Sequence, residues 1–103
     1  TVPVQLRHLL DDVHYQMEHK SFSHDELVAR FHHRLVLIHP FPNGNGRHAR
    51  LMADLLIHQL GGNPFTWGGS SLDKASEIRT RYINALRAAD KGDIVPLVLF
   101  MRS

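Results

Sequence analysis

Apolar residues recur at helical spacing through residues 1–39, and this pattern predicts two amphipathic helices. The first should end near 18–20, and its apolar side chains are Leu6, Leu9, Leu10, Val13 and Met17. The second should begin after Ser23, because Ser23 and Glu26 have the spacing of a capping box. Its main apolar positions are Leu27, Phe31, Leu35 and Ile38. It should end at His39, since Pro40 disfavours a helical conformation in the residue before it.

A loop rich in turn-forming residues is predicted at 40–46, which holds two prolines, two asparagines and two glycines. A third helix is predicted over 47–60, because helical spacing returns there and Gly61 and Gly62 end it. Its predicted apolar face consists of Leu51, Met52, Leu55 and Leu56.

The sequence of the last third of the chain predicts a loop over 63–70 and two more helices. One should run from Leu72 to Ala89, and Asp93 should cap a shorter one that ends at Met101. No segment alternates apolar and polar residues in the manner of a strand. We therefore expect an all-α fold, a compact bundle of about five helices built around the 47–60 helix.

Composition narrows the possible functions. The 103 residues include 12 Lys plus Arg and 10 Asp plus Glu, and this net charge of +2 does not favour a nucleic-acid partner. The absence of cysteine excludes disulfides, thiolate zinc sites and a cysteine nucleophile, and it suits the cytoplasm. No apolar run approaches the roughly 20 residues that cross a bilayer, so no membrane partner is expected. The nine histidines lack metal-ligand pairing, and most are expected at the surface or half-buried.

The segment that carries candidate chemistry is 39–50, where a glycine-rich loop leads into a helix. Gly44 and Gly46 permit positive φ and close approach of a ligand to the backbone. Successive N–H groups beside a helix N-terminus can bind an anion. Arg47 and Arg50 lie three residues apart, so both guanidiniums project from one face of the first turn. This combination suits a multiply charged phosphate chain.

His39, at the other side of the loop, is a candidate base, because histidine commonly serves as a general base. A phosphate site beside one base favours phosphoryl or nucleotidyl transfer to a hydroxyl. Simpler interpretations stay open for each residue taken alone. The loop could be an ordinary turn, Arg50 could pair with Asp54 one turn later, and His39 could be a plain helix-end residue.

The order His-Pro-Phe-x-x-Gly-Asn-Gly-Arg-x-x-Arg at 39–50 resembles the signature of the Fic domain family. The similarity extends to 35–38, 81–86 and 92–97, so it covers nearly the whole chain, and Pro42-Asn43 resembles the subgroup called mobile mystery protein B. The resemblance implies an all-helical core and transfer of AMP, or another nucleotide, from ATP or another nucleoside triphosphate. The acceptor would be a serine, threonine or tyrosine hydroxyl of a target protein.

The resemblance also implies a role for each motif residue. His39 would be the general base, and Phe41 would point into the core and anchor the loop. The phosphate-binding residues would be Gly44, Asn45, Gly46, Arg47 and Arg50. In that set the N–H groups near 44–46 would hold phosphates, and the Asn45 side-chain amide would add a donor. Arg47 would bind the β-phosphate side of the donor nucleotide. Arg50 would bind the terminal phosphate or brace the loop.

One residue departs from the family pattern. Asn43 stands where the family usually has an acidic residue that holds Mg²⁺, so it is a weak metal-ligand candidate with a neutral oxygen. It is equally a turn former that tolerates left-handed geometry. This departure favours one alternative function, a Fic-like module that binds a nucleotide or protein without turnover.

The resemblance finally sets the expected domain organisation. Residues 1–103 would be a single Fic-like domain, the C-terminal part of a longer Fic protein. The family's flap and its inhibitory-helix pattern are not found in this sequence. A separate inhibitory helix or partner is therefore expected to control the activity.

Overall fold

The computed structural model describes residues 1–70 and 72–103 and confirms the all-α prediction. Its helices are α1 (Val2–His19), α2 (His24–Ile38), α3 (Asn45–Gln59), α4 (Ala75–Asp90) and α5 (Val95–Arg102). Within these described ranges there is no strand, and no helix is long and apolar enough to span a membrane. The residues form two compact units, Thr1–Asn63 and Pro64–Ser103, which we describe separately. The expectation of one domain over 1–103 stays a prediction.

Local signals in the sequence set the ends of α1 and α2. Thr1 caps α1 by accepting a hydrogen bond from the Val4 amide, and α1 ends at His19 as predicted. The Ser23 hydroxyl caps α2 by accepting a hydrogen bond from the Glu26 amide at 3.3 Å. The Glu26 carboxylate lies 3.0 Å from Arg30 one turn later, so it contributes a half-buried ion pair within α2.

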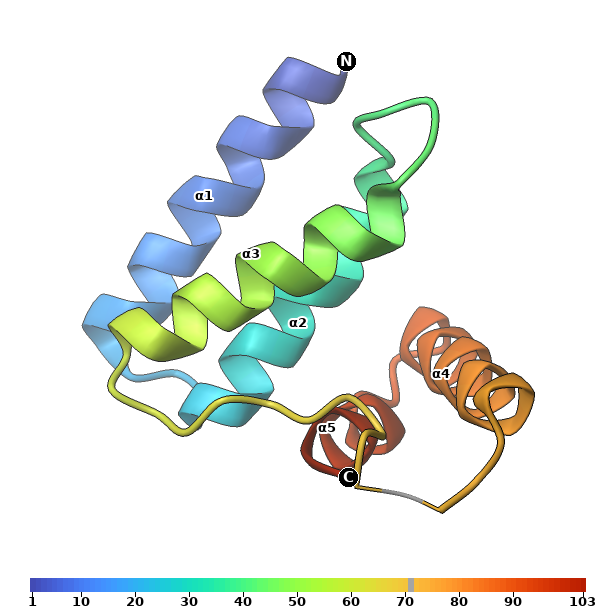
Figure 1. The fold of residues 1–103 in the computed structure, drawn as a ribbon. Coiled ribbons are helices and arrows are strands. Elements are labelled where there is room, and N and C mark those ends of the chain that lie inside the picture. The colour runs from blue at the N-terminus through green and yellow to red at the C-terminus, as the bar shows by residue number, and fades with distance from the viewer. Residues whose placement is uncertain (71) are drawn as a thin grey trace. The chain divides into compact units, whose positions relative to one another are not determined.

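In the first unit α2 packs against both α1 and α3 (Figure 1). It therefore occupies the centre that the sequence assigned to the 47–60 helix. The physical reason is the width of its buried surface, which extends well beyond a single stripe. Its buried residues are Leu27, Val28, Ala29, Phe31, His32 and Leu35.

The buried stripe of α3 differs from the predicted one. Its buried residues are Asn45, Ala49, Ala53 and Ile57, spaced one turn apart. Leu51 and Leu55 of the predicted apolar face are 57% and 50% exposed, and Met52 and Leu56 are half-buried. Small side chains allow two helices to approach closely, so α3 presents its alanines, and not its larger leucines, to the core.

The second unit consists of a loop segment and the pair α4 and α5, which pack against each other. The predicted start of α4 at Leu72 is wrong, because Leu72 is fully exposed and α4 begins at Ala75. Because Leu72 buries no apolar surface, packing does not stabilise a helix that extends over it. The N-cap of α5 is Ile94, one residue after the predicted Asp93, although the Asp93 carboxylate accepts a hydrogen bond from the Val95 amide at 3.2 Å.

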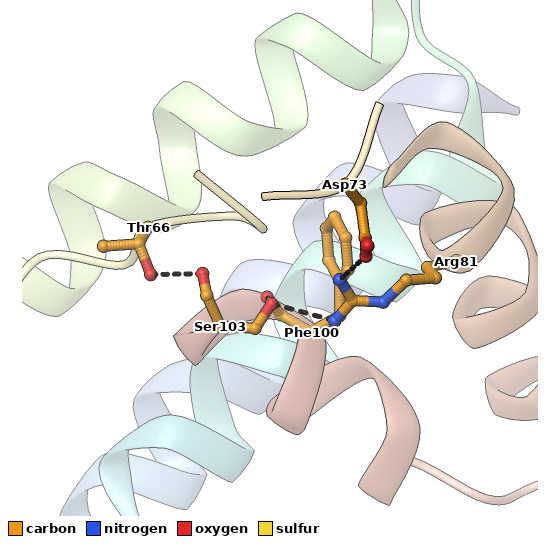
Figure 2. A network of polar contacts seen from close by, with 5 residues as sticks. All are labelled: Thr66, Asp73, Arg81, Phe100 and Ser103. Carbon is orange, nitrogen blue, oxygen red and sulfur yellow. Dashed lines mark hydrogen bonds and ion pairs between the residues drawn. The ribbon is translucent and has the colours of Figure 1, made fainter. Parts of the chain in front are cut away.

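A polar network joins three segments of the second unit (Figure 2). The Arg81 guanidinium lies 3.3 Å from the Asp73 carboxylate and donates to the Ser103 hydroxyl at 3.2 Å. The Ser103 hydroxyl donates to the Phe100 carbonyl, and the Thr66 hydroxyl donates to the Ser103 carbonyl, both at 2.7 Å. The network ties the segment before α4 to the end of α5, although exposed ion pairs add little stability.

Candidate active site

The candidate loop joins α2 to α3 and lies toward the end of the first unit where α1 begins (Figure 1). α2 ends where Pro40 predicts, and His39 is its C-cap. His39 adopts left-handed geometry, with φ 53° and ψ 60°, and its amide donates to the Leu35 carbonyl at 3.3 Å. Its side chain is exposed. The candidate base therefore stands at the end of a helix, accessible to a separate molecule.

Gly44 is the N-cap of α3 and has a φ of 74°. Its carbonyl accepts a hydrogen bond from the His48 amide at 3.0 Å, which begins the helix. A Cβ at Gly44 would lie 3.7 Å from an Arg47 guanidinium nitrogen, so the Arg47 side chain folds back beside this turn. The backbone turn and the Arg47 charge therefore lie together, as the sequence predicted.

Gly46 does not need the conformational freedom expected of it. It lies within the first turn of α3 and is not among the glycines with positive φ. A Cβ added there would meet nothing within 4 Å. The missing side chain leaves open space beside the helix N-terminus, which is where an anion would approach.

The first turn of α3 carries no acidic residue, so nothing there opposes the positive end of the helix. The Arg47 and Arg50 side chains are both exposed. Arg50 also lies close enough to the α2 residue His32 to disfavour its protonation. Both arginines thus belong to the helix end where a phosphate chain would bind.

The Asn45 side chain hydrogen-bonds the backbone of Phe41, and its predicted phosphate contact stays a prediction. It is 7% exposed. Its Oδ1 accepts a hydrogen bond from the Phe41 amide at 3.0 Å, and its Nδ2 donates to the Phe41 carbonyl at 2.8 Å. The side chain therefore fastens the loop to α3, while its backbone N–H remains part of the helix N-terminus.

The predicted burial of Phe41 is wrong. Its side chain is 45% exposed, so the ring does not enter the core. It lies edge to face with the His48 ring, with centroids 4.8 Å apart and an interplanar angle of 82°. The loop is anchored by polar contacts instead, since Asn45 hydrogen-bonds both the N–H and the C=O of Phe41.

Asn43 is exposed and does not have positive φ, so the left-handed geometry expected of a turn former is used by Gly44 instead. Among the described residues, no three His, Cys, Asp or Glu side chains are grouped as metal ligands. Asn43 offers one neutral oxygen, so an ion here would take its remaining ligands from phosphate and water.

One site residue was missed by the sequence, which placed most histidines at the surface. His32 is fully buried on α2. Burial lowers the pKa of His32 from 6.5 to about 4, with smaller contributions from Arg50 and His33. A hydrogen bond to the backbone of Ala49 opposes this shift. The available signal was spacing, since position 32 lies one turn after Val28 on the apolar side of the helix.

Comparison with known proteins agrees with this geometry. The model of the Fic/DOC family matches residues 1–57. "Protein adenylyltransferase fic-1" of Caenorhabditis briggsae is 34% identical over 98 residues, covering 93% of this chain and 18% of that protein. "Protein adenylyltransferase Fic" of Drosophila virilis and its Drosophila melanogaster counterpart are each 36% identical over 85 residues, covering 82% of this chain and 16% of each relative.

The chain thus spans less than a fifth of the length of these relatives. No solved structure matches it at a significant level.

Proposed function

Because this chain belongs to the Fic/DOC family, we propose that it carries the active loop of a protein adenylyltransferase. The reaction transfers AMP from ATP to a serine, threonine or tyrosine hydroxyl of a target protein. Relatives that bear the name protein adenylyltransferase support the reaction class. The choice of donor base and of acceptor side chain is part of the proposal.

The observation that carries the proposal is the start of α3. A turn at Gly44, the open space at Gly46 and the Arg47 guanidinium meet at a helix N-terminus without acidic side chains. Backbone N–H groups there suit the phosphates of a nucleotide, and Arg47 and Arg50 suit its leaving pyrophosphate. Preorganised donors of this kind stabilise charge that grows on the leaving group.

His39 supplies the base in this proposal. Its imidazole takes the proton of the target hydroxyl while the hydroxyl oxygen attacks the α-phosphorus. A new phosphorus–oxygen bond to the target forms as the bond between the α- and β-phosphates breaks, and pyrophosphate leaves. The exposure of His39 supports this role, because the acceptor belongs to another protein. No covalent enzyme intermediate is needed, since the chain aligns the two reactants.

The metal and the control of activity belong to the same proposal. Mg²⁺ bound with the nucleotide would neutralise phosphate charge, and Asn43 would supply one neutral oxygen ligand. A separate inhibitory helix or partner protein would limit the activity. Location in the cytoplasm and membership of the mobile mystery protein B subgroup stay predictions.

Transfer is tested by incubating the purified protein with lysate and ATP labelled at the α-phosphate, with and without Mg²⁺. The expected result is a labelled protein that is absent with His39→Ala. ATP labelled at the γ-phosphate should give no label, because the γ-phosphate leaves with pyrophosphate. Label from the γ-phosphate alone would assign phosphate transfer in place of AMP transfer.

The second candidate is a module that binds a nucleotide without turnover, and the neutral Asn43 is the observation that favours it. Calorimetry with ATP and the labelling experiment together separate the two candidates. Binding of ATP without labelled protein, in every lysate and metal condition, would support the binding module.

A further inference from the structure

The active loop is fastened by two hydrogen bonds between one side chain and the backbone of one residue, a pairing similar to that between two strands of a sheet. Pro40 and Pro42 have no N–H group, so Phe41 has the one backbone donor in this stretch. That donor bonds to the Asn45 side-chain oxygen, and the Asn45 amide nitrogen bonds to the carbonyl of the same residue, Phe41. The Phe41 N–H and C=O belong to the peptide units before and after its Cα, so the two bonds restrain the backbone on both sides of Phe41.

These bonds close a ring of chain over residues 41–45. The ring contains Asn43 and Gly44, so the metal-ligand candidate and the left-handed turn both lie inside it. Asn45 is 7% exposed, which limits competition from water for its two hydrogen bonds to Phe41. The closed ring therefore restricts where the turn can place its N–H groups.

A second contact acts on the Phe41 ring. His48 lies three residues after Asn45, so the two side chains project from the same face of α3. The Phe41 ring is 45% exposed, and it meets the His48 ring edge to face at 4.8 Å. His48 thus contacts the side chain of Phe41, whereas Asn45 holds the Phe41 backbone.

His39 is restrained from both sides as a result. Its amide bonds to Leu35 at the end of α2, and only Pro40 separates it from the fastened Phe41. The proline ring fixes φ at position 40, so little freedom remains between the two attachments.

We propose that Asn45 and His48 are positioning residues that hold Phe41 and thereby set the geometry of the 41–45 ring and of His39. The catalytic part of this inference rests on the proposed transfer function. The structural part, a fastened Phe41, does not depend on that function.

The structural part is tested by amide hydrogen exchange of Phe41, measured by NMR on the full chain. Asn45→Ala removes both hydrogen bonds, so exchange should accelerate by about tenfold or more. Asn45→Leu is a second variant of similar size, and it should also accelerate exchange because it can neither accept from the Phe41 amide nor donate to the Phe41 carbonyl. Asn43→Ala is the matched control, an exposed asparagine inside the same ring, and should leave Phe41 exchange unchanged.

The positioning part is tested by the rate of AMP transfer and the Kd for ATP. Asn45→Ala should lower kcat by about tenfold or more while ATP affinity changes less than about threefold. A side chain that bound phosphate directly would show the reverse pattern. His48→Phe keeps a ring against Phe41 and should retain activity, whereas His48→Ala should lose a measurable part of kcat.

Unchanged Phe41 exchange in a folded Asn45→Ala or Asn45→Leu variant would overturn the proposal, whatever the activity. Faster exchange with an unchanged kcat would also overturn it, because the contact would then position nothing. If the wild-type protein transfers no AMP, the proposed function fails. The exchange measurements and the ATP affinities of the same variants then still decide whether Asn45 holds the loop or binds phosphate.

Discussion

His32 on α2 hydrogen-bonds the backbone of Ala49 on α3, one turn beyond the N-terminus that forms the candidate phosphate site. Both residues are fully buried. The contact joins the two helices that the active loop connects.

Folding stability should fall as the pH is lowered from 6.5 to 4. Burial lowers the pKa of His32 from 6.5 to about 4, so in this window the unfolded state binds the proton more readily. The contribution of neutral His32 is complete above pH 6.5 and lost below pH 4, with a maximum of about 3 kcal/mol. Urea unfolding at several pH values in this range measures the slope of the free energy of unfolding against pH. His32→Gln should remove this part of the slope, and the exposed His58→Gln should retain it.

His39→Gly should be more stable than His39→Ala by about 1 kcal/mol, because left-handed geometry strains any residue that has a Cβ. Both variants should lose AMP transfer, since neither has a base. Both should bind ATP within about tenfold of wild type, or 1.4 kcal/mol, because the base acts on the incoming hydroxyl. Urea unfolding and calorimetry with ATP provide these values. A larger loss of ATP affinity would assign His39 to nucleotide binding.

Gly44→Ala and Gly46→Ala should have opposite effects on stability. Gly44 has a φ of 74°, so alanine there should cost about 1 kcal/mol. Gly46 lies in a helix with open space around it, and alanine there should stabilise by up to about 1 kcal/mol.

Gly46→Ala should nevertheless weaken ATP binding, because its methyl group occupies the approach to the helix N-terminus. Thermal unfolding and ATP titration of the same sample measure the two effects together. A stabilised variant with unchanged ATP affinity would mean that phosphate does not approach at Gly46.

Asn43→Asp should make ATP binding more dependent on Mg²⁺. The new carboxylate repels the triphosphate in chelator and offers an anionic oxygen to the ion when Mg²⁺ is present. ATP affinity should therefore fall in chelator and rise with Mg²⁺, relative to wild type. Both proteins are titrated with ATP under the two conditions. An equal gain from Mg²⁺ in both would mean that residue 43 does not face the metal.

Local sequence signals predicted most helix ends, because short-range geometry decides them. Ser23 begins α2, Pro40 stops it, and Gly61 follows α3. The face of α3 was not predictable in this way. Hydrophobicity favours Leu51 and Leu55, whereas close packing against α2 selects the smaller alanines, and that preference depends on the partner helix.

The motif likewise predicted which residues gather at the loop but not how each is used. Asn45 is polar and adjacent to the phosphate site, so a ligand contact was the direct expectation from sequence. Its pairing with Phe41 depends on the chain turning back over four residues, which residue types alone do not specify. The positive φ of His39 was likewise not predicted from the sequence.

The ring of residues 41–45 divides the site between two helices. His39 is the C-cap of α2, whereas Gly44 and Arg47 belong to the start of α3. In the proposed reaction, the separation of base and phosphate therefore depends on how α2 packs against α3 as well as on the contacts to Phe41. A bulkier residue at Ala49, which is fully buried, would shift one helix against the other and misalign the reactants without touching either reactant.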